Sequence, residues 1–330
     1  MEWDPSCFFR LEGSPSPYAL LILNQPINEK AFGVLSEHAS YIICADGGAN
    51  RLYDMMKTHG NESTELPDQI MGDLDSIHPS TRKHYEDLGV PIIKDPDQYS
   101  TDFTKCLKYL NSHAAEIITS PRRQKRKPAS TTQETTATAK KSQSTLEIVI
   151  LGGLGGRVDQ AFSQIHHLYM MTQTQRQLRE SQEPNAHDET EKLGHGAGGN
   201  LYLISEESIT FILQEGNNII YTPATNRPDT DTPDDQDSPV KESQSHLKRK
   251  RGQEGSAQPE YFFEENIGII PLSAPASITT QGFEWDVENW HTEIGGQLST
   301  SNHIRADKVE VSTSVPVLFT VELAQRLKRA

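Results

Sequence analysis

Three aspartates provide the clearest chemical signal in this chain. Asp73 and Asp75 lie two residues apart in a Gly-Asp-Leu-Asp-Ser segment after an apolar run, and Asp102 opens a later Asp-Phe-Thr-Lys segment. Two carboxylates at i and i+2 in an extended loop point to one side and repel each other, and a divalent cation relieves that repulsion. Because Mg²⁺ takes oxygen ligands and bridges carboxylates to phosphates, these aspartates predict a Mg²⁺ site for a nucleotide polyphosphate. An Asx turn into the next helix is the alternative for the first pair.

A helix is predicted to begin at Asp102, with Ser100 or Thr101 as its N-cap. Lys105, three residues later, falls on the same arc as Asp102. A carboxylate beside an ammonium group near the positive end of a helix suits a metal-bound phosphate, and a surface ion pair is the alternative. The other arc is apolar and is predicted to face the core: Phe103, Cys106, Leu107 and Leu110.

Two glycine-rich segments are candidates for phosphate contact. The first follows an apolar run and contains Asp46, Gly47, Gly48 and Asn50. Ligands bind beyond the carboxyl ends of parallel strands, and glycines let the backbone approach them closely. A tight turn capped by Asp46 is the alternative.

The second glycine-rich segment contains Gly153, Gly155, Gly156, Arg157 and Asp159. Its backbone N–H groups could cradle a phosphate, and the arginine could clamp the phosphate oxygens. The segment is neither a Walker A loop, because no Gly-Lys-Ser/Thr follows, nor a dinucleotide fingerprint, because Val158 stands in place of the third glycine. A structural turn is the alternative. The helix after it is predicted to turn Phe162, Ile165 and Leu168 inward.

A polar segment near the C-terminal end contains Ser299, Thr300, Ser301 and Asn302, and Trp285 and Trp290 precede it. An aromatic face beside hydroxyl and amide groups suits a flat heteroaromatic substrate, above all a cationic one. A buried tryptophan followed by a β-turn is the alternative.

The elements that must position these residues change in type along the chain. Apolar runs at 18–23, 41–44, 69–71, 91–93, 148–151 and 201–204 alternate with helical patterns. This alternation predicts βαβ units and a mainly parallel sheet. Beyond residue 208 the apolar residues recur with period two, which is typical of a β-sandwich. We therefore predict a three-layer α/β domain at 1–205 and an all-β sandwich at 206–330.

Three polar stretches are predicted to be disordered insertions, at about 121–145, 172–200 and 222–260. Basic runs at 122–127 and 248–251 suit nuclear import or nucleic-acid contact, although solvated loop charge is the simpler interpretation. The net charge of −15 argues against broad binding to nucleic acid or an anionic membrane.

Neither a secretory signal nor an apolar run of about 18 residues is present, so no membrane span is expected. The chain has three cysteines, Cys7, Cys44 and Cys106. Their odd number and the absence of CxxC spacing argue against a disulfide framework and favour a reducing compartment. We expect a cytoplasmic protein, and the basic insertions leave a nuclear fraction open.

Taken in order, five segments resemble the thiamine pyrophosphokinase family in a fungal form: residues 44–50, 72–76, 97–105, 152–159 and 297–302. The resemblance implies an N-terminal α/β domain, a C-terminal β-sandwich and a homodimer with active sites between the subunits. It also implies a Mg²⁺-dependent reaction in which ATP and thiamine give thiamine diphosphate and AMP.

The resemblance also implies roles for single residues. It implies Mg²⁺ ligation by Asp73, Asp75 and Asp102, and phosphate contact by Lys105 and Arg157. It implies a nucleotide side made of Asp46, Gly47, Gly48, Asn50, Gly153, Gly155, Gly156 and Asp159. The thiamine side is implied to be Gln98, Ser299, Thr300, Ser301 and Asn302. Trp285 is the candidate for stacking on the pyrimidine ring, with Trp290 as the alternative. Gln160 departs from the histidine that the family often has there.

Two other functions compete with this one. A Rossmann-type dinucleotide enzyme is disfavoured by the missing third glycine and by the paired aspartates. A non-catalytic thiamine or nucleotide sensor is disfavoured because a pure binder has little need of three metal ligands. The general base for thiamine's hydroxyl stays open between Asp73 and water.

Overall fold

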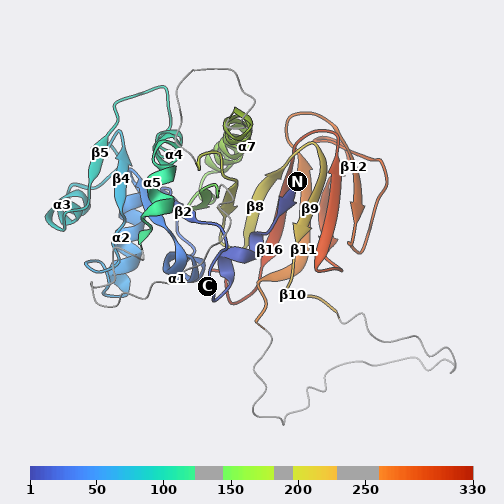
Figure 1. The fold of residues 1–330 in the computed structure, drawn as a ribbon, viewed down its shortest axis with the longest axis horizontal. Helices are drawn as coiled ribbons and strands as arrows, with labels where there is room; N and C mark the ends of the chain where they lie inside the picture. Colours follow the sequence, from blue (N-terminus) through green and yellow to red (C-terminus); the bar gives the residue numbers. More distant parts are fainter. Residues whose placement is uncertain (123–143, 182–195, 229–259, 330) are drawn as a thin grey trace, which may run out of the picture.

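The computed structural model describes residues 1–122, 144–181, 196–228 and 260–329. Six parallel strands form the first part of the main sheet, in the order β7-β6-β2-β3-β4-β5 (Figure 1). They match the predicted apolar runs to within one or two residues: β2 (Tyr18–Ile22), β3 (Tyr41–Ala45), β4 (Gln69–Gly72), β5 (Ile92–Lys94), β6 (Glu147–Leu151) and β7 (Leu201–Ile204).

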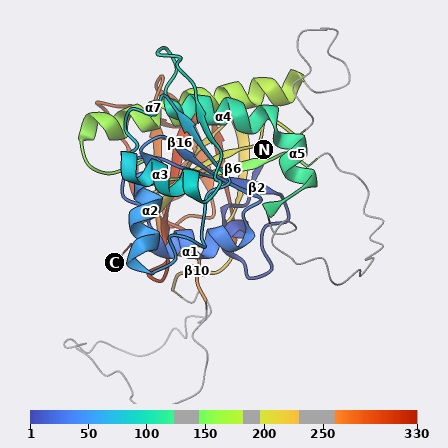
Figure 2. The ribbon, with the colours of Figure 1, turned by 90° about the vertical axis from the view of Figure 1, so that its left-hand side faces the viewer.

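Helices cover both faces of this parallel sheet, with α4 and α7 on one side and α1 on the other (Figure 2). Along β2, Leu20 and Ile22 join the core beneath α1 (Glu29–His38), α2 (Gly48–Thr58) and α3 (Pro79–Asp87). Leu21 joins the core beneath α4 (Asp102–Ser112), α5 (Ala114–Thr119) and α7 (Val158–Ser181). Because successive strand residues point to opposite faces, continuous apolar runs are what a sheet buried on both faces requires.

The remaining strands build an all-β part. The main sheet continues past β7 through β8 (Ser208–Leu213), β16 (Val317–Leu323), β11 (Phe263–Pro271) and β10 (Thr225–Asn226), and β14 (Ser299–His303) pairs with β11. A second sheet has the order β1 (Glu2–Trp3), β9 (Gly216–Tyr221), β15 (Lys308–Thr313), β12 (Ala276–Gln281) and β13 (Trp290–Thr292). Apolar residues of both sheets share one core, so the predicted α/β part followed by an all-β sandwich is confirmed.

The two parts are connected more closely than a division at residue 205 suggests. The pairing changes from parallel to antiparallel between β7 and β8, but the sheet itself continues without a break. Residues 2–3 form β1, which pairs with β9 in the second sheet. The Asn28 side chain, just before α1, donates to the backbone oxygens of Ser205 at 3.1 Å and Leu327 at 2.9 Å.

One predicted insertion is shorter than expected. α7 continues to Ser181, and Thr172 and Gln175 within it are buried, so the insertion does not begin at residue 172. Arg122, inside the first predicted insertion, is buried and bonds Asp68 at 3.0 Å. Residues 123–143, 182–195 and 229–259 lie outside the described residues, and with them the predicted disorder and almost all of both basic runs.

The inward face predicted for α7 is partly wrong. Leu168 is buried and Ile165 is partly buried, but the Phe162 side chain is 66% exposed. The first turns of α7 therefore present apolar surface to solvent in the single chain. All three cysteines are buried and free of disulfides. Across the described segments, every helix is too short or too polar to cross a membrane.

Stability should depend on the protonation of Glu147 at the start of β6. Desolvation raises the pKa of its carboxyl to about 7, although the nearby Arg179 charge and the N–H group of Asn200 oppose this rise. The folded chain therefore keeps a proton that the unfolded chain releases near pH 4.5, and stability should fall as pH rises from about 4.5 to about 7. Glu147→Gln should flatten this fall. Thermal unfolding of both proteins across this range checks it, and parallel curves would contradict it.

Candidate active site

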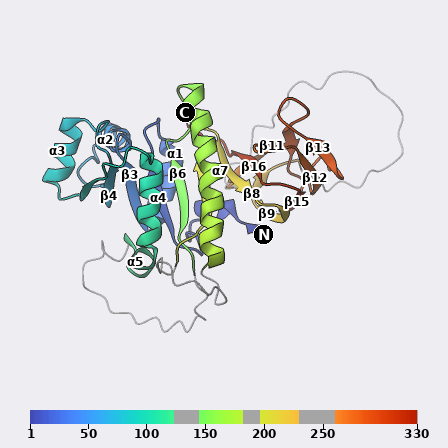
Figure 3. The same cartoon turned by 90° about the horizontal axis from the view of Figure 1, so that it is seen from above.

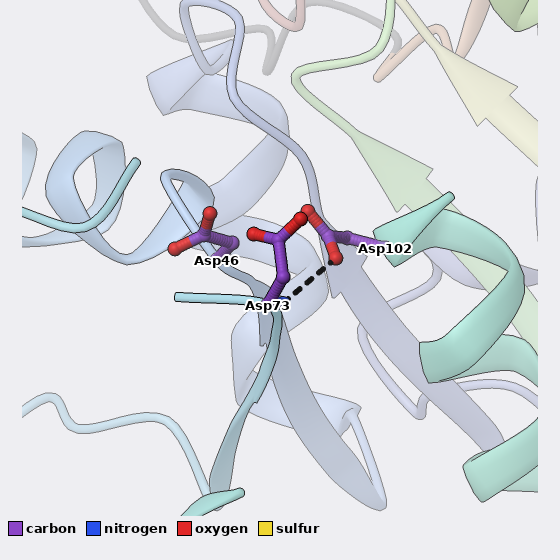
Figure 4. A group of neighbouring side chains, drawn as sticks. All are labelled: Asp46, Asp73 and Asp102. Atoms are coloured by element: carbon purple, nitrogen blue, oxygen red, sulfur yellow. Dashed lines mark hydrogen bonds between the residues drawn. The ribbon is translucent and has the colours of Figure 1, made fainter. Parts of the chain in front are cut away.

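Three carboxylates meet at the carboxyl edge of the parallel sheet. Asp46 follows β3, Asp73 follows the neighbouring β4, and Asp102 is the first residue of α4. One oxygen of each lies within 4.8 Å of the others. In Figure 4 the carboxylates of Asp73 and Asp102 face each other, and the Asp46 side chain lies beside them with its carboxylate turned away. The backbone N–H of Asp73 also donates to Asp102 Oδ1 at 3.2 Å. Three segments distant in sequence thus place negative charge at one point.

Asp46 fixes the loop that carries Asp73. Its two carboxylate oxygens accept the backbone N–H groups of Ser76 and Ile77, each at 2.9 Å. The Asn50 side chain adds two bonds to the same loop, donating to Ser76 O and accepting from His78 N, each at 2.9 Å. Both residues, predicted to face the nucleotide, are therefore bound to the protein's own backbone in this structure.

The Asp46 carboxyl is buried, and this burial raises its pKa above the usual range. The N–H groups of Ser76 and Ile77 counteract the rise in part, whereas the charges of Asp102 and Asp73 add to it. A cation beside the three carboxylates would offset this repulsion.

Lys105 places a positive charge beside the group. The helix begins where predicted: Thr101 is the N-cap and accepts the N–H of Thr104 at 3.3 Å. Lys105 Nζ lies 3.1 Å from Asp102 Oδ1, and its side chain is only 1% exposed. Burial lowers the pKa of this ammonium, but the bond to Asp102 and the charges of Asp73 and Asp95 outweigh that effect and leave its pKa raised. The lysine is therefore charged and held toward the carboxylates.

Asp75 is not part of this group. Its side chain is exposed and accepts the Ser76 hydroxyl at 2.8 Å. The structure thus joins Asp46, and not Asp75, to Asp73 and Asp102. Strand order contains the missing signal: β3 and β4 are parallel neighbours, so residues that follow them share one edge of the sheet.

Gly72 is a site residue that the sequence interpretation missed. A Cβ atom at this position would lie 2.8 Å from Asp46 Cβ and 2.9 Å from Asp102 Oδ1. Only glycine lets the end of β4 pass between these two carboxylates. Its position at the end of a strand, directly before Asp73, was the available signal.

Gly72→Ala should force Asp46 and Asp102 apart and lower kcat about 100-fold, because small displacements of positioned groups are costly. Gly33→Ala is the matched control: it lies in α1 with nothing within 4 Å of the added atom, so it should keep full activity and gain about 0.5–1 kcal/mol. Turnover assays and thermal unfolding of both variants check the prediction. Normal turnover of Gly72→Ala would contradict it.

Both glycine segments lie beside residues that the sequence interpretation also missed. Asn24 and Gln25 come shortly after β2, the strand that lies between β3 and β6 in the sheet. A Cβ at Gly47 would meet the Asn24 amide nitrogen at 2.3 Å, and one at Gly156 would meet Gln25 Oε1 at 2.9 Å. The connections after β2 and β6 leave toward opposite faces of the sheet, so this is its switch point, where ligands of such folds bind.

Arg157 and Asp159 do not contact the carboxylate group in this structure. Both are exposed and pair with each other, with Arg157 Nη2 2.6 Å from Asp159 Oδ2. This bond lowers the pKa of the Asp159 carboxyl. Gly155 and Gly156 have φ values of 131° and 67°, conformations that favour glycine, so the turn itself requires them.

The residues predicted for the aromatic site also come together. Trp285, Trp290 and the segment 299–302 line one surface pocket of about 430 Å³ on the β-sandwich. Trp285 is 54% exposed, and Trp290 is partly buried. Gln98 is exposed in the loop between β5 and α4 and does not line this pocket. Residues of β12 and β14 line the pocket. Figures 1 and 3 show β12 at the end of the molecule opposite β4.

A parallel α/β sheet with an acidic, lysine-bearing edge continues into a β-sandwich with an aromatic pocket, so the chain has two parts that each carry a candidate site. Residues 32–179 match the family model of the thiamin pyrophosphokinase catalytic domain, and residues 251–318 match the vitamin B1 binding domain of the same enzymes. The chain belongs to the thiamin pyrophosphokinase family. The predicted family is confirmed, and the chain is a transferase that makes thiamine diphosphate with ATP.

Individual relatives agree with this assignment. Thiamine pyrophosphokinase 1 from Oryza sativa is 26% identical over 96% of both chains, and the Saccharomyces cerevisiae enzyme is 26% identical over 92% of this chain and 85% of its own. Among solved structures, thiamin pyrophosphokinase from Candida albicans superposes with a TM-score of 0.66, covering 98% of this chain and 93% of its own at 24% identity. The yeast structure gives a TM-score of 0.65 at 22% identity, covering 98% and 91%. The structural matches support the fold.

Proposed function

We propose that the chain transfers a diphosphate group from ATP to the hydroxyl of thiamine in a Mg²⁺-dependent reaction that releases AMP. The observation that carries this proposal is the convergence of Asp46, Asp73 and Asp102 beside the buried ammonium of Lys105. Catalysis of phosphoryl transfer depends mainly on positioning and on neutralising charge. An acidic protein with a formal charge of −15 needs such a local arrangement to accept a polyphosphate.

The carboxylate group fits a magnesium ion. Octahedral Mg²⁺ has bonds of about 2.1 Å, so opposite ligands are about 4.2 Å apart. One oxygen of Asp73 and one of Asp102 lie within 4.8 Å of each other, so small side-chain rotations would bring both to one ion. We propose Asp73 and Asp102 as ligands, with Asp46 holding the loop, and Asp75 as the further ligand if that loop turns inward. Bound there, the ion would neutralise phosphate charge and orient the polyphosphate.

The protein's own groups have proposed roles around that ion. Lys105 would contact the transferred phosphates, and Arg157 would release Asp159 to contact the departing AMP. The N–H groups near Gly153 and Gly156 would face the nucleotide at the switch point. The proton of thiamine's hydroxyl passes to Asp73 or to water, and the geometry favours neither.

We further propose that the active site forms between two copies of the chain. Support comes from the separation of two strands of the same chain in Figure 1: β12, which lines the Trp285 pocket, and β4, which ends directly before Asp73. A two-fold dimer could place the pocket of one subunit against the carboxylates of the other. The exposed Phe162 beside the glycine segment offers apolar surface for such contact. Cytoplasmic location stays part of the proposal, supported by three unpaired cysteines.

Subunit mixing tests the shared site. Asp73→Asn and Trp285→Ala chains are unfolded together, refolded and assayed at low thiamine concentration. Each mixed dimer would contain one site with the intact tryptophan of one chain and the intact aspartate of the other. Random pairing should restore about a quarter of wild-type activity. No gain over the separate variants would contradict a site made by two chains.

The reaction itself is tested by incubating purified protein with ATP, Mg²⁺ and thiamine and measuring AMP, ADP and thiamine diphosphate together. AMP and thiamine diphosphate in equal amounts, lost when EDTA is added, are the expected result. ADP in place of AMP would mean that a single phosphoryl group is transferred. Activity that persists without divalent metal would remove the role proposed for Asp73 and Asp102 as metal ligands.

A further inference from the structure

The indole of Trp285 forms a wall of the sandwich pocket, yet more than half of this side chain is exposed. It lies in the connection between β12 and β13. A half-exposed aromatic ring stacks well on a substrate only if its position is fixed before binding. Two residues at the end of β14, Asn302 and His303, contact this connection.

Asn302 holds the backbone of Trp285 from both sides. Its Oδ1 accepts the Trp285 N–H at 3.1 Å, and its Nδ2 donates to the Trp285 oxygen at 2.9 Å. The same Oδ1 also accepts the backbone N–H of His303 at 2.8 Å. The Asn302 side chain is buried, so its amide is engaged by the protein and not turned toward a substrate.

His303 supports the ring itself. The centroids of the two rings are 5.1 Å apart with an interplanar angle of 43°. His303 Nδ1 lies 2.7 Å from Glu284 Oε2, and Arg305 links Glu284 to Glu265. His303 is absent from the lining of the pocket, so it acts on a ligand there indirectly, and Trp285 is the lining residue whose ring it contacts.

We propose that Asn302 and His303 are positioning residues that hold Trp285 in its stacking orientation before thiamine binds. Asn302 fixes the backbone and His303 fixes the ring. The inference rests on the proposed thiamine site for its functional consequence, but the immobilisation of Trp285 can be measured without substrate.

The first test uses the free protein. In a Trp290→Phe background, Trp285 is the only exposed tryptophan, because Trp3 is buried. His303→Asn keeps a hydrogen-bonding group near the Nδ1 position but removes the ring, whereas His303→Phe keeps a ring and removes the bond to Glu284. Acrylamide quenching and fluorescence anisotropy should report a more mobile Trp285 in His303→Asn and in Asn302→Ala, and an unchanged one in His303→Phe. Equal behaviour of all variants would overturn the proposal.

The second test is a double-mutant cycle on the assayed enzyme. His303→Asn should raise the KM for thiamine about three- to tenfold with kcat and the KM for ATP unchanged, and His303→Phe should stay near wild type. In a Trp285→Ala background, His303→Asn and Asn302→Ala should have no further effect on the KM for thiamine. Additive effects would mean that these residues contact substrate directly and would overturn the positioning role. If no thiamine diphosphate forms at all, the proposed function fails while the fluorescence result still decides the positioning.

Discussion

Replacing Asp73 with asparagine is expected to lower kcat by about 10³-fold or more while the melting temperature stays close to that of the wild type. Asp73 contributes one of three converging carboxylates, and its own oxygen accepts only a long 3.3 Å bond from the Asp75 N–H among the described contacts. The amide keeps that bond but loses the negative charge. Removing one of three repelling charges also relieves strain in the folded protein, so stability should not suffer.

Asp46→Asn is the matched comparison. Asp46 is buried and accepts two backbone N–H groups, and an amide can accept only one of them. This variant should lose activity together with about 1–3 kcal/mol of stability. Steady-state kinetics over a range of Mg²⁺ concentrations, with thermal unfolding of both variants, separates the two effects. A folded Asp73→Asn protein with ordinary turnover would refute the metal assignment.

Truncating Trp285 to alanine is expected to raise the KM for thiamine about 10- to 100-fold and leave the KM for ATP within about twofold of its normal value. Stacking of an aromatic side chain on a heteroaromatic ring contributes about 1–3 kcal/mol. Since the Trp285 side chain is 54% exposed, its removal should cost little folding free energy. The measurement is a pair of saturation curves, one for each substrate, on wild-type and variant enzyme.

Trp290→Ala provides the control for this prediction. Trp290 begins β13, pairs with Ile278 of β12 and packs against the main core, so its loss should lower the melting temperature. If Trp290→Ala disturbs thiamine binding more than Trp285→Ala does, the stacking role belongs to Trp290. Equal changes in both KM values for Trp285→Ala would make that side chain structural.

The parallel sheet could be predicted closely from the sequence, because strands buried on both faces are continuous apolar runs that stand out from helical patterns. Leu20 and Leu21 of β2, neighbours in sequence, lie in different cores, and both had to be apolar. The helix at Asp102 was predictable for a related reason: Thr101 supplies a cap, and the buried positions recur with helical spacing.

What the sequence could not provide was the packing partner of each polar or exposed residue. Phe162 fits an inward arc by spacing, but α7 contacts the core through Leu168, Thr172 and Gln175. Gln175 can be buried because Asn111 donates a hydrogen bond to its side-chain oxygen at 2.8 Å. The two residues are 64 positions apart, so the polar composition of the segment gives no sign of this contact. For the same reason the polar residues from 172 onward were mistaken for an insertion.

The candidate site shows the same division. To predict that Asp73 and Asp102 lie together, it was enough to know where one strand ends and one helix begins. To predict that Asp46, and not Asp75, is the third member, one also needs to know that β3 and β4 are neighbours in the sheet. Asn302 lines the same pocket as Ser299, Thr300 and Ser301, but its amide is bound to the Trp285 backbone, which no motif could indicate.

The position of β16 determines when this protein can complete its fold during synthesis. This strand, Val317–Leu323, lies between β8 and β11 and shares extensive pairing with both. Until β16 leaves the ribosome, β8 and β11 each have an open edge, because the strand that pairs with both is missing. About fifty residues separate β8 from β11 in the sequence, so β8 waits longest for its partner. A message truncated shortly before this point would therefore yield an aggregation-prone chain, even though every proposed catalytic carboxylate had already been translated.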